Sequence, residues 1–402
     1  MTIEPDSSGA DLYRETAAFL ETCGARPAGS PAEAAALSWL QARMELLGYA
    51  CQRQPFTFTP LSPRLLRNLL GSAVVIAAAA LLPRFPYLAL ALPVWLALLP
   101  ALQRDFQARL PGRLVSHNLL CLPGGDAGKV DPDRVGVDPD SVEVDLLLTA
   151  HVDTARALPY RSGWLLALRA QWFDILRRVG WITALTGGLS VLVDGLPPLI
   201  IGAVLLFAAL SGLVLLAVDL SDAFGAGGAH TRGANDNASG VIVLLALARR
   251  LADLPGLQKR VGFLFSGAEE VGLVGARHAA QWLQPCAARL RVVSVDMVGA
   301  GERLNIYQGV SGLRSLRTDP RLNAALQRAD PQAQGFFSHR RSGDFAPFAQ
   351  AGFRASGIEA SGSPQFWSAY HTLRDDLPLL QPERMARTVE VLARLVEQLD
   401  LD

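Results

Sequence analysis

The spacing of apolar residues predicts several amphipathic helices. Apolar positions recur at helical spacing over Asp11–Cys23 and Pro31–Leu47. Ser30 precedes the second segment as an N-cap, and Gly48 follows it at the position where a glycine commonly ends a helix. Two more helices are predicted over Val241–Leu251 and Gly272–Leu283.

Other segments have the pattern of β-strands. Gln52–Phe58 alternates like a half-buried strand, whereas Val144–Thr149 is mostly apolar, which is typical of a central strand buried on both faces. The remaining predicted strands are Leu114–Leu122, Val261–Ser266 and Arg291–Val295. Because strands and helices alternate, we expect an α/β fold with a mixed, largely parallel sheet flanked by helices. In such folds the functional site lies beyond the carboxyl ends of the strands.

Two long apolar stretches interrupt this alternation, Leu65–Leu102 and Val179–Val218. A helix needs about 20 apolar residues to span the hydrocarbon of a bilayer, and Phe85–Gln103 and Gly195–Val218 are long enough. Each stretch is therefore interpreted as a helical hairpin that dips into or crosses a membrane. The alternative is a pair of buried helices or a hydrophobic lid in a soluble protein.

The two hairpins divide the chain into one discontinuous domain and two insertions. Residues 1–63, 112–160 and 221–402 are predicted to form the main domain, and residues 64–111 and 161–220 the insertions. Arginines flank the hairpins on the side of the main domain, at Arg64, Arg67, Arg104, Arg109, Arg113, Arg169, Arg177 and Arg178. By the positive-inside rule, we expect a multi-pass protein of the cell (inner) membrane, with the main domain on the cytoplasmic side and the bilayer as a partner. No cleavable signal peptide is expected at the first residues.

Composition narrows the classes of partner. The chain has 37 basic and 37 acidic residues, so its charge gives no reason to expect a nucleic acid partner. The four cysteines lie apart without a CxxC motif, and we expect them to be reduced core residues. The sequence leaves the oligomeric state open.

Five residues of metal-binding type are spread along the predicted main domain. In chain order they are His151, Asp236, Glu270, Asp296 and His371. Three of them follow predicted strands, whose carboxyl ends meet at one edge of a parallel sheet. A single such residue says little, but carboxylates and imidazoles that converge at one edge suit two zinc ions held close together.

Two further carboxylates stand next to these residues. Asp153 lies two residues after His151 and can fix its ring, because a metal-binding imidazole needs a partner for its second nitrogen. Glu269 immediately precedes Glu270 and can serve as the general base toward a metal-bound water. The expected chemistry is metal-dependent hydrolysis.

The stretches around these residues form an ordered set of motifs. They are Arg26–Ser30, Asn118–Leu120, Ala150–Asp153, Gly233–Gly240, Ser266–Ala276, Val295–Met297 and Tyr370–Asp376. Together they resemble the di-zinc exopeptidase family of bacterial leucyl aminopeptidases, aminopeptidase Y and glutamate carboxypeptidase. The resemblance covers nearly all of the chain outside the hairpins and implies the zinc-exopeptidase fold, of the phosphorylase/hydrolase-like type.

The resemblance also implies a role for each candidate ligand. Asp236 would bridge two zinc ions, and the peptide bond after it would be strained, with a cis form accommodated by its small neighbours. His151 and Asp296 would complete one zinc site. Glu270 and His371 would complete the other.

For the two remaining carboxylates, the resemblance implies that Glu269 is the general base and that Asp153 holds the His151 ring. The sequence departs from the family in two places. Ser342–Asp344 carries an extra glycine compared with the family's Ser-Asp segment, so no substrate contact is transferred to it. The stretch Thr154–Asn235, between two candidate ligands, is unusually long because it contains the second hairpin.

The preferred functional interpretation is a membrane-associated, zinc-dependent exopeptidase with peptide substrates, an aminopeptidase that removes N-terminal residues. Two alternatives remain on the same scaffold. One is a glutaminyl-cyclase-like or amidohydrolase activity, which would favour a single zinc ion. The other is a catalytically silent membrane receptor or scaffold, although such relatives usually lose ligands that this sequence keeps.

Overall fold

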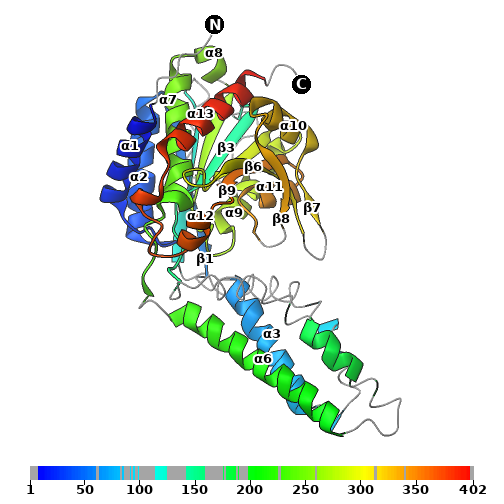
Figure 1. The fold of residues 1–402 in the computed structure, drawn as a ribbon. Coiled ribbons are helices and arrows are strands. Elements are labelled where there is room, and N and C mark those ends of the chain that lie inside the picture. The colour runs from blue at the N-terminus through cyan, green and yellow to red at the C-terminus, as the bar shows by residue number, and fades with distance from the viewer. Residues whose placement is uncertain are drawn as a thin grey trace. The chain divides into compact units, whose positions relative to one another are not determined.

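The computed structural model describes most of the chain (Figure 1). The residues described are 8–59, 63–81, 84–85, 91, 94–95, 98, 114–124, 142–158, 175, 178–186, 189, 198–224, 228–258, 260–311, 315–338 and 341–398. The chain forms two compact units. Unit 1 comprises Met1–Phe58, Gly112–Ala157 and Ala229–Asp402, and unit 2 comprises Thr59–Pro111 and Leu158–Gly228.

A mixed β-sheet forms the centre of unit 1. Its strands are β1 (Tyr49–Phe58), β2 (Leu114–Pro123), β3 (Leu146–His151), β4 (Val261–Ser266), β5 (Arg291–Asp296), β6 (Arg303–Val310), β7 (Leu316–Arg317), β8 (Gln334–Ser338) and β9 (Arg354–Ser361). The order is β1-β2-β4-β3-β5-β9-β6-β7, and β8 pairs with β6. Strands β4, β3, β5 and β9 run parallel, whereas β1, β2, β6 and β7 join by antiparallel pairing. The α/β fold is as predicted, but parallel pairing is concentrated at the centre and does not dominate the whole sheet.

Helices cover both faces of this sheet. One face carries α1 (Gly9–Cys23), α2 (Pro31–Leu46), α7 (Ser239–Ala252), α10 (Pro320–Ala329) and α13 (Pro382–Glu397), several of which lie together in Figure 1. The other face carries α9 (Val274–Trp282) and α11 (Phe345–Gln350). The short helices are α8 (Pro255–Gln258), α12 (Pro364–Ala369), η5 (Gln284–Cys286) and η6 (Leu377–Leu379), and the turn η4 (Ala234–Ala238) leads into α7.

The central strands contribute to a hydrophobic core on each face. In β3, Leu146 and Leu148 join the cluster under α7, whereas Leu147 between them joins the cluster under α9 and α11. This alternation follows from the pleat, which turns successive side chains to opposite faces. Because both faces are covered, every position of β3 is buried, and this explains its largely apolar sequence.

Two long helices are described in unit 2, α3 (Pro63–Leu81) and α6 (Pro198–Phe224). Within the described residues, no helix combines the length and the apolar character that a membrane span requires. The predicted membrane-crossing hairpins and transmembrane helices are therefore not supported.

Much of the predicted hairpin region is not part of this description. Most of Phe85–Gln103 lies outside the described residues, and so does most of the second insertion before Pro198. The predicted location, an inner membrane with the main domain on its cytoplasmic side, is not tested by the structure and stays a prediction.

Cys51 and Cys121 form a disulfide, contrary to the expectation that all cysteines are reduced. The antiparallel register of β1 and β2 places the two residues directly opposite each other, with Cα atoms 4.2 Å apart. They are 70 residues apart in sequence, so their spacing gave no sign of the pairing. Cys23 and Cys286 are buried thiols that form no disulfide, as predicted.

Candidate metal centre

The five predicted ligands converge beyond the carboxyl ends of the parallel strands. His151 is the last residue of β3 and Asp296 the last residue of β5. Glu270 lies in the turn after β4, Asp236 lies in η4 before α7, and His371 follows α12. The sheet topology therefore brings together residues from five separate segments of the chain.

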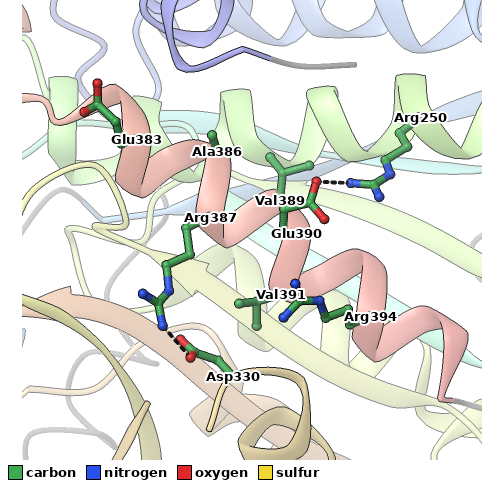
Figure 2. Close-up of a pocket in the computed structure, with 9 residues that line it drawn as sticks. All are labelled: Arg250, Asp330, Glu383, Ala386, Arg387, Val389, Glu390, Val391 and Arg394. Atoms are coloured by element: carbon green, nitrogen blue, oxygen red, sulfur yellow. Dashed lines mark hydrogen bonds and ion pairs between the residues drawn. The ribbon is translucent and has the colours of Figure 1, made fainter. Parts of the chain in front are cut away.

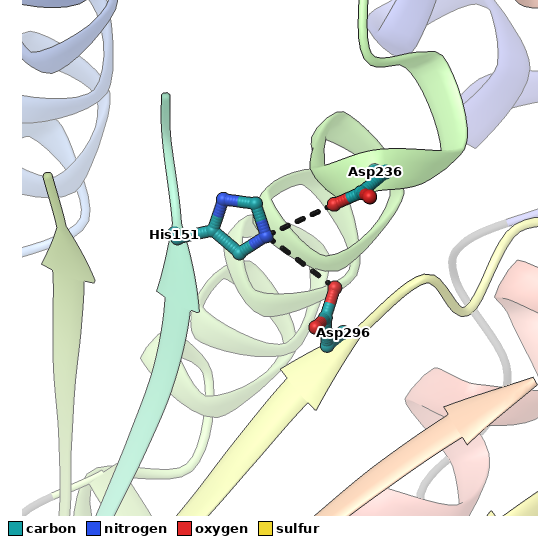
Figure 3. A group of neighbouring side chains, drawn as sticks. All are labelled: His151, Asp236 and Asp296. Carbon is teal, nitrogen blue, oxygen red and sulfur yellow. Dashed lines mark ion pairs between the residues drawn. The ribbon is translucent and has the colours of Figure 1, made fainter. Parts of the chain in front are cut away.

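Asp236 lies between the two histidines. Its Oδ1 is 3.1 Å from Nε2 of His151, and its Oδ2 is 3.1 Å from Nε2 of His371. Oδ1 of Asp296 is 3.5 Å from the same nitrogen of His151, as Figure 3 shows. Oε2 of Glu270 is 3.3 Å from Nε2 of His371. The result is two groups of three residues that share Asp236, and in each group the candidate ligand atoms lie within 4.8 Å of one another.

These groups contain polar atoms without hydrogen bonds. Among the described residues, Nε2 of His151, Oε1 of Glu270 and Oδ1 of Asp296 are buried and have no hydrogen-bond partner. A buried polar atom left in this state costs about 1–3 kcal/mol, so a ligand that satisfies it is strongly favoured. Imidazole and carboxylate donors are those that zinc accepts in proteins, and the residues fit such ions.

The pKa values of the candidate ligands also indicate that positive charge would stabilise the site. Burial raises the pKa of both Glu270 and Asp296, which disfavours their ionised forms. Burial acts against ionisation of Asp236 as well, but the neighbouring imidazoles of His151 and His371 keep its pKa below the ordinary value. Burial lowers the pKa of His371, yet Glu270 and Asp236 more than offset this and bring it to about 10. Added positive charge, which metal ions would supply, would therefore stabilise the ionised carboxylates.

Backbone strain is concentrated around these side chains. Ala268, Met297 and His371 have φ values of 54°, 49° and 53°, in the left-handed region that non-glycine residues rarely adopt. Such conformations cost about 1–3 kcal/mol each and persist where the surroundings enforce them. Ala268 precedes the candidate base and Met297 follows a candidate ligand, so the strain occurs where the chain must aim side chains into the site.

The loop Gly233–Gly240 brings Asp236 to the edge of the sheet. The side-chain amide of Asn237 donates to the carbonyl oxygen of Val295 at 2.9 Å, which ties the loop to the end of β5. A Cβ on Gly240 would lie 2.5 Å from that same carbonyl oxygen, so only glycine allows this approach. The peptide bond after Asp236 is cis, which is the form that the family resemblance suggested for it.

Asp153 supports the turn that carries Glu269 and Glu270. Its Oδ1 accepts from the backbone N–H of Glu269 at 2.9 Å, and its Oδ2 from that of Glu270 at 3.0 Å. Nδ1 of His151 lies 3.1 Å from the main-chain oxygen of Asp153 but 3.6 Å from its carboxylate. Asp153 therefore lies beside the His151 ring with its carbonyl oxygen, which is the closer atom, as well as with the predicted carboxylate. The carboxylate is already engaged by the two backbone N–H groups.

Two more buried carboxylates belong to the site but were not assigned from the sequence. Asp375 accepts from the backbone N–H groups of Asn235 and Asp236, at 2.7 and 3.1 Å, and burial raises its pKa to about 7. Asp344 accepts from the hydroxyl of Ser266, and burial raises its pKa to about 6. The sequence signal for Asp375 was its place in the last family motif. For Asp344, the extra glycine before it obscured the match.

Among the described residues, the candidate metal groups include none of the histidines His117, His230 and His278. His278 instead stacks on the ring of Phe56, with centroids 4.9 Å apart. His339 lies outside the described residues.

A separate pocket of about 440 Å³ lies along α13 and contains none of the predicted site residues (Figure 2). Charged side chains line it, but they are largely paired with one another. Arg387 contacts Asp330 at 2.7 Å, and Arg250 contacts Glu390 at 2.5 Å. These pairs satisfy the charges of the pocket within the protein, so the metal groups remain the candidate site.

Part of the chain matches a known peptidase family. Residues 218–396 match the family model described as Peptidase family M28. The chain is 30% identical over 175 residues to Aminopeptidase YwaD of Bacillus subtilis (strain 168), and the aligned part is 41% of this chain and 37% of that protein. The match thus spans little more than a third of the relative's length. Over part of its length, the chain is thus similar to this family and to an aminopeptidase.

Solved structures share the fold. A zinc aminopeptidase from Bacillus subtilis has a TM-score of 0.54 at 14% identity, with 98% of this chain and 96% of that chain covered. A glutaminyl cyclase from an Acidobacteriales bacterium has a TM-score of 0.53 at 15% identity, with 100% and 99% covered. At such identities the similarity shows the fold alone, and proteins described by two different activities share it.

Proposed function

We propose that this chain is a zinc-dependent aminopeptidase of peptidase family M28, which holds two zinc ions and removes N-terminal residues from peptides. The observation that carries the proposal is the position of Asp236, whose two carboxylate oxygens each lie 3.1 Å from an imidazole nitrogen of His151 or His371. Asp296 would complete one zinc site and Glu270 the other. The aminopeptidase relative supports a peptide substrate.

The chain's own residues supply the proton transfers. Bound zinc would polarise the scissile carbonyl group and lower the pKa of water. Glu269 takes a proton from the attacking water and passes it to the leaving amine. Burial, reinforced by Glu270 and Asp344 and opposed by His151, raises the pKa of Glu269 well above its ordinary value, which suits a proton acceptor. Asp153 holds the backbone of Glu269 and so fixes where this carboxylate starts.

A panel of aminoacyl-arylamides tests the proposal directly. Each substrate is supplied once with a free amine and once with an acetylated amine. We expect hydrolysis of the free-amine substrates only, and its loss after treatment with a zinc chelator. Equal hydrolysis of the acetylated substrates would contradict an aminopeptidase, and turnover that survives complete zinc removal would contradict the role of the metal.

A glutaminyl-cyclase-like reaction is the second candidate, because a solved cyclase shares the fold over almost its whole length. Peptides that begin with glutamine separate the two activities. A cyclase retains the residue as a ring and releases ammonia, whereas an aminopeptidase releases free glutamine. A catalytically silent receptor would do neither, even when loaded with zinc.

A further inference from the structure

Arg26 is the largest fully buried side chain among the described residues. Removing a guanidinium from water is costly, so a buried one needs several partners. In the part of the chain that the structure describes, none of its hydrogen bonds goes to a carboxylate; all its side-chain bonds end on main-chain oxygens. Arg26 is therefore not held in the core by a simple ion pair.

The guanidinium joins three segments of the chain. Its Nε donates to the carbonyl oxygen of Val152 at 2.8 Å. Its Nη1 donates to the carbonyl oxygens of Gly24 at 2.6 Å and Arg232 at 2.9 Å. Its Nη2 donates to the carbonyl oxygen of Gly233 at 3.2 Å. One planar group thus binds the segment that follows β3 and the segment that leads into η4.

These two segments carry the metal-binding groups His151 and Asp236. Arg26 also pairs with the first segment through its backbone, since its N–H donates to Oγ1 of Thr154 at 2.9 Å and its carbonyl accepts from the N–H of Thr154 at 3.0 Å. A Cβ on Gly233 would lie 2.5 Å from the Thr154 side chain, so the segments are in contact at this point. The Phe19 ring covers the guanidinium, with Cζ 4.9 Å from its centroid.

We propose that Arg26 is a positioning residue that sets the separation of His151 and Asp236 and thereby the zinc affinity of the group formed with Asp296. The inference rests on the proposed function, because it assumes that these side chains bind zinc. The physical basis is the rigid fork of guanidinium donors, which reaches carbonyl groups on both segments at once. A lysine keeps the charge but presents a compact ammonium, which cannot span the same acceptors.

The test is the zinc dissociation constant of Arg26→Lys, measured by competition with a chromogenic chelator, together with thermal unfolding of the metal-free protein. We expect zinc binding to weaken by about 10–100-fold, as is typical when a group that orients metal ligands is lost. Arg43→Lys is the matched control. Its guanidinium stacks on Trp39 at 3.3 Å and bonds to the carbonyl oxygen of that residue, which is not in a ligand segment. Its zinc affinity should stay within about twofold of the wild type.

Further variants distinguish the effect of the guanidinium geometry on zinc affinity from the effect of its positive charge. Arg26→Met should weaken zinc binding about as much as Arg26→Lys does. Full affinity in Arg26→Lys with loss in Arg26→Met would show that the charge matters instead, and wild-type affinity in a folded Arg26→Lys would overturn the proposal. If neither variant folds, Thr154→Val removes one bond to Arg26, and zinc affinity unchanged in that variant would overturn it too. A wild-type chain that binds no zinc would instead refute the proposed function.

Discussion

In the loop before α7, the side chain of Asp236 is proposed to bind metal, whereas the side chains of its two neighbours hold the loop in position. Asp236 faces the two histidines, whereas the side chains of Asn235 and Asn237 accept from the backbone N–H groups of Gly299 and Met297. The loop is therefore fastened to the segment after β5 on both sides of the shared carboxylate. Side chains that never touch a metal ion thus determine where the carboxylate lies.

Glu269→Gln should reduce kcat by about 10²–10⁴-fold, because the amide cannot accept the proton of the attacking water. Zinc content should not change, since Glu269 is not one of the five proposed ligands and its backbone bond to Asp153 remains. Steady-state kinetics and elemental analysis of the same sample check both points. Glu21→Gln, an exposed change on α1, is the control. A Glu269→Gln variant with wild-type kcat would exclude Glu269 as the base.

Asp236→Ala should lose zinc from both proposed sites, because each of the two candidate groups contains this carboxylate. Elemental analysis after dialysis measures the loss. Asp319→Ala is the matched control, since Asp319 is the N-cap of α10 and accepts from the N–H of Leu322. That change should lower the free energy of unfolding by about 1 kcal/mol and leave the zinc content intact. Full zinc content in Asp236→Ala would rule out a bridging role.

At the scale of elements, the sequence predicted helices and strands well as far as Asp296. The reason is that α1, α2, β4 and β5 bury regular apolar patterns. Strand β9 was not predicted, because its buried positions include the polar residues Ser356 and Glu359. Glu359 is stable there because Arg341 contacts it at 2.7 Å and the hydroxyl of Tyr307 donates to it. Such partners come from distant parts of the chain and leave no periodic signal.

Glu33 makes the stability of the metal-free protein depend on pH. It lies in the first turn of α2, and burial raises its pKa from 4.5 to about 8, although it accepts from the N–H of Ala268. Because the folded-state pKa is above the unfolded value, the folded protein binds more protons between these limits. The free energy of unfolding should therefore fall as the pH rises from about 4.5 to about 8.

Urea unfolding of the metal-free protein across this pH range measures the effect. Glu33→Gln should flatten the profile, because the amide does not titrate. Glu45→Gln, an exposed change on the same helix, should keep the wild-type profile. A Glu33→Gln profile as steep as that of the wild type would show that other carboxylates cause the dependence.

For the whole molecule, the strongest sequence prediction was the set of site residues. Some of these residues were identified because they follow predicted strands, and the others because they lie in the ordered family motifs. The structure brings all five proposed ligands together. The contacts that hold them could not be predicted, because they depend on tertiary neighbours. The carboxylate of Asp153 also bonds to the turn that carries Glu269, which was not expected, and three of the four carbonyl partners of Arg26 lie in segments far from it in sequence. The membrane-crossing helices predicted from apolar content are not supported by the described residues of unit 2.

Removal of metal should destabilise unit 1 as a whole. Zinc would bind the folded site and not the unfolded chain, so at about 1,000 times its dissociation constant it should add about 4 kcal/mol to the free energy of unfolding. We therefore expect a lower Tm after chelation and recovery on addition of zinc, measured by differential scanning calorimetry. Magnesium at the same concentration should not restore the Tm, because it binds imidazole poorly. A Tm that is indifferent to zinc would contradict a zinc site in the folded protein.

The most direct measurement is anomalous scattering at the zinc edge from crystals of the zinc-loaded protein. The account predicts two peaks on opposite sides of the Asp236 carboxylate. One should lie beside His151 and Asp296, and the other beside His371 and Glu270. A single peak would favour the cyclase-like alternative, and a map without any peak among these side chains would contradict the account.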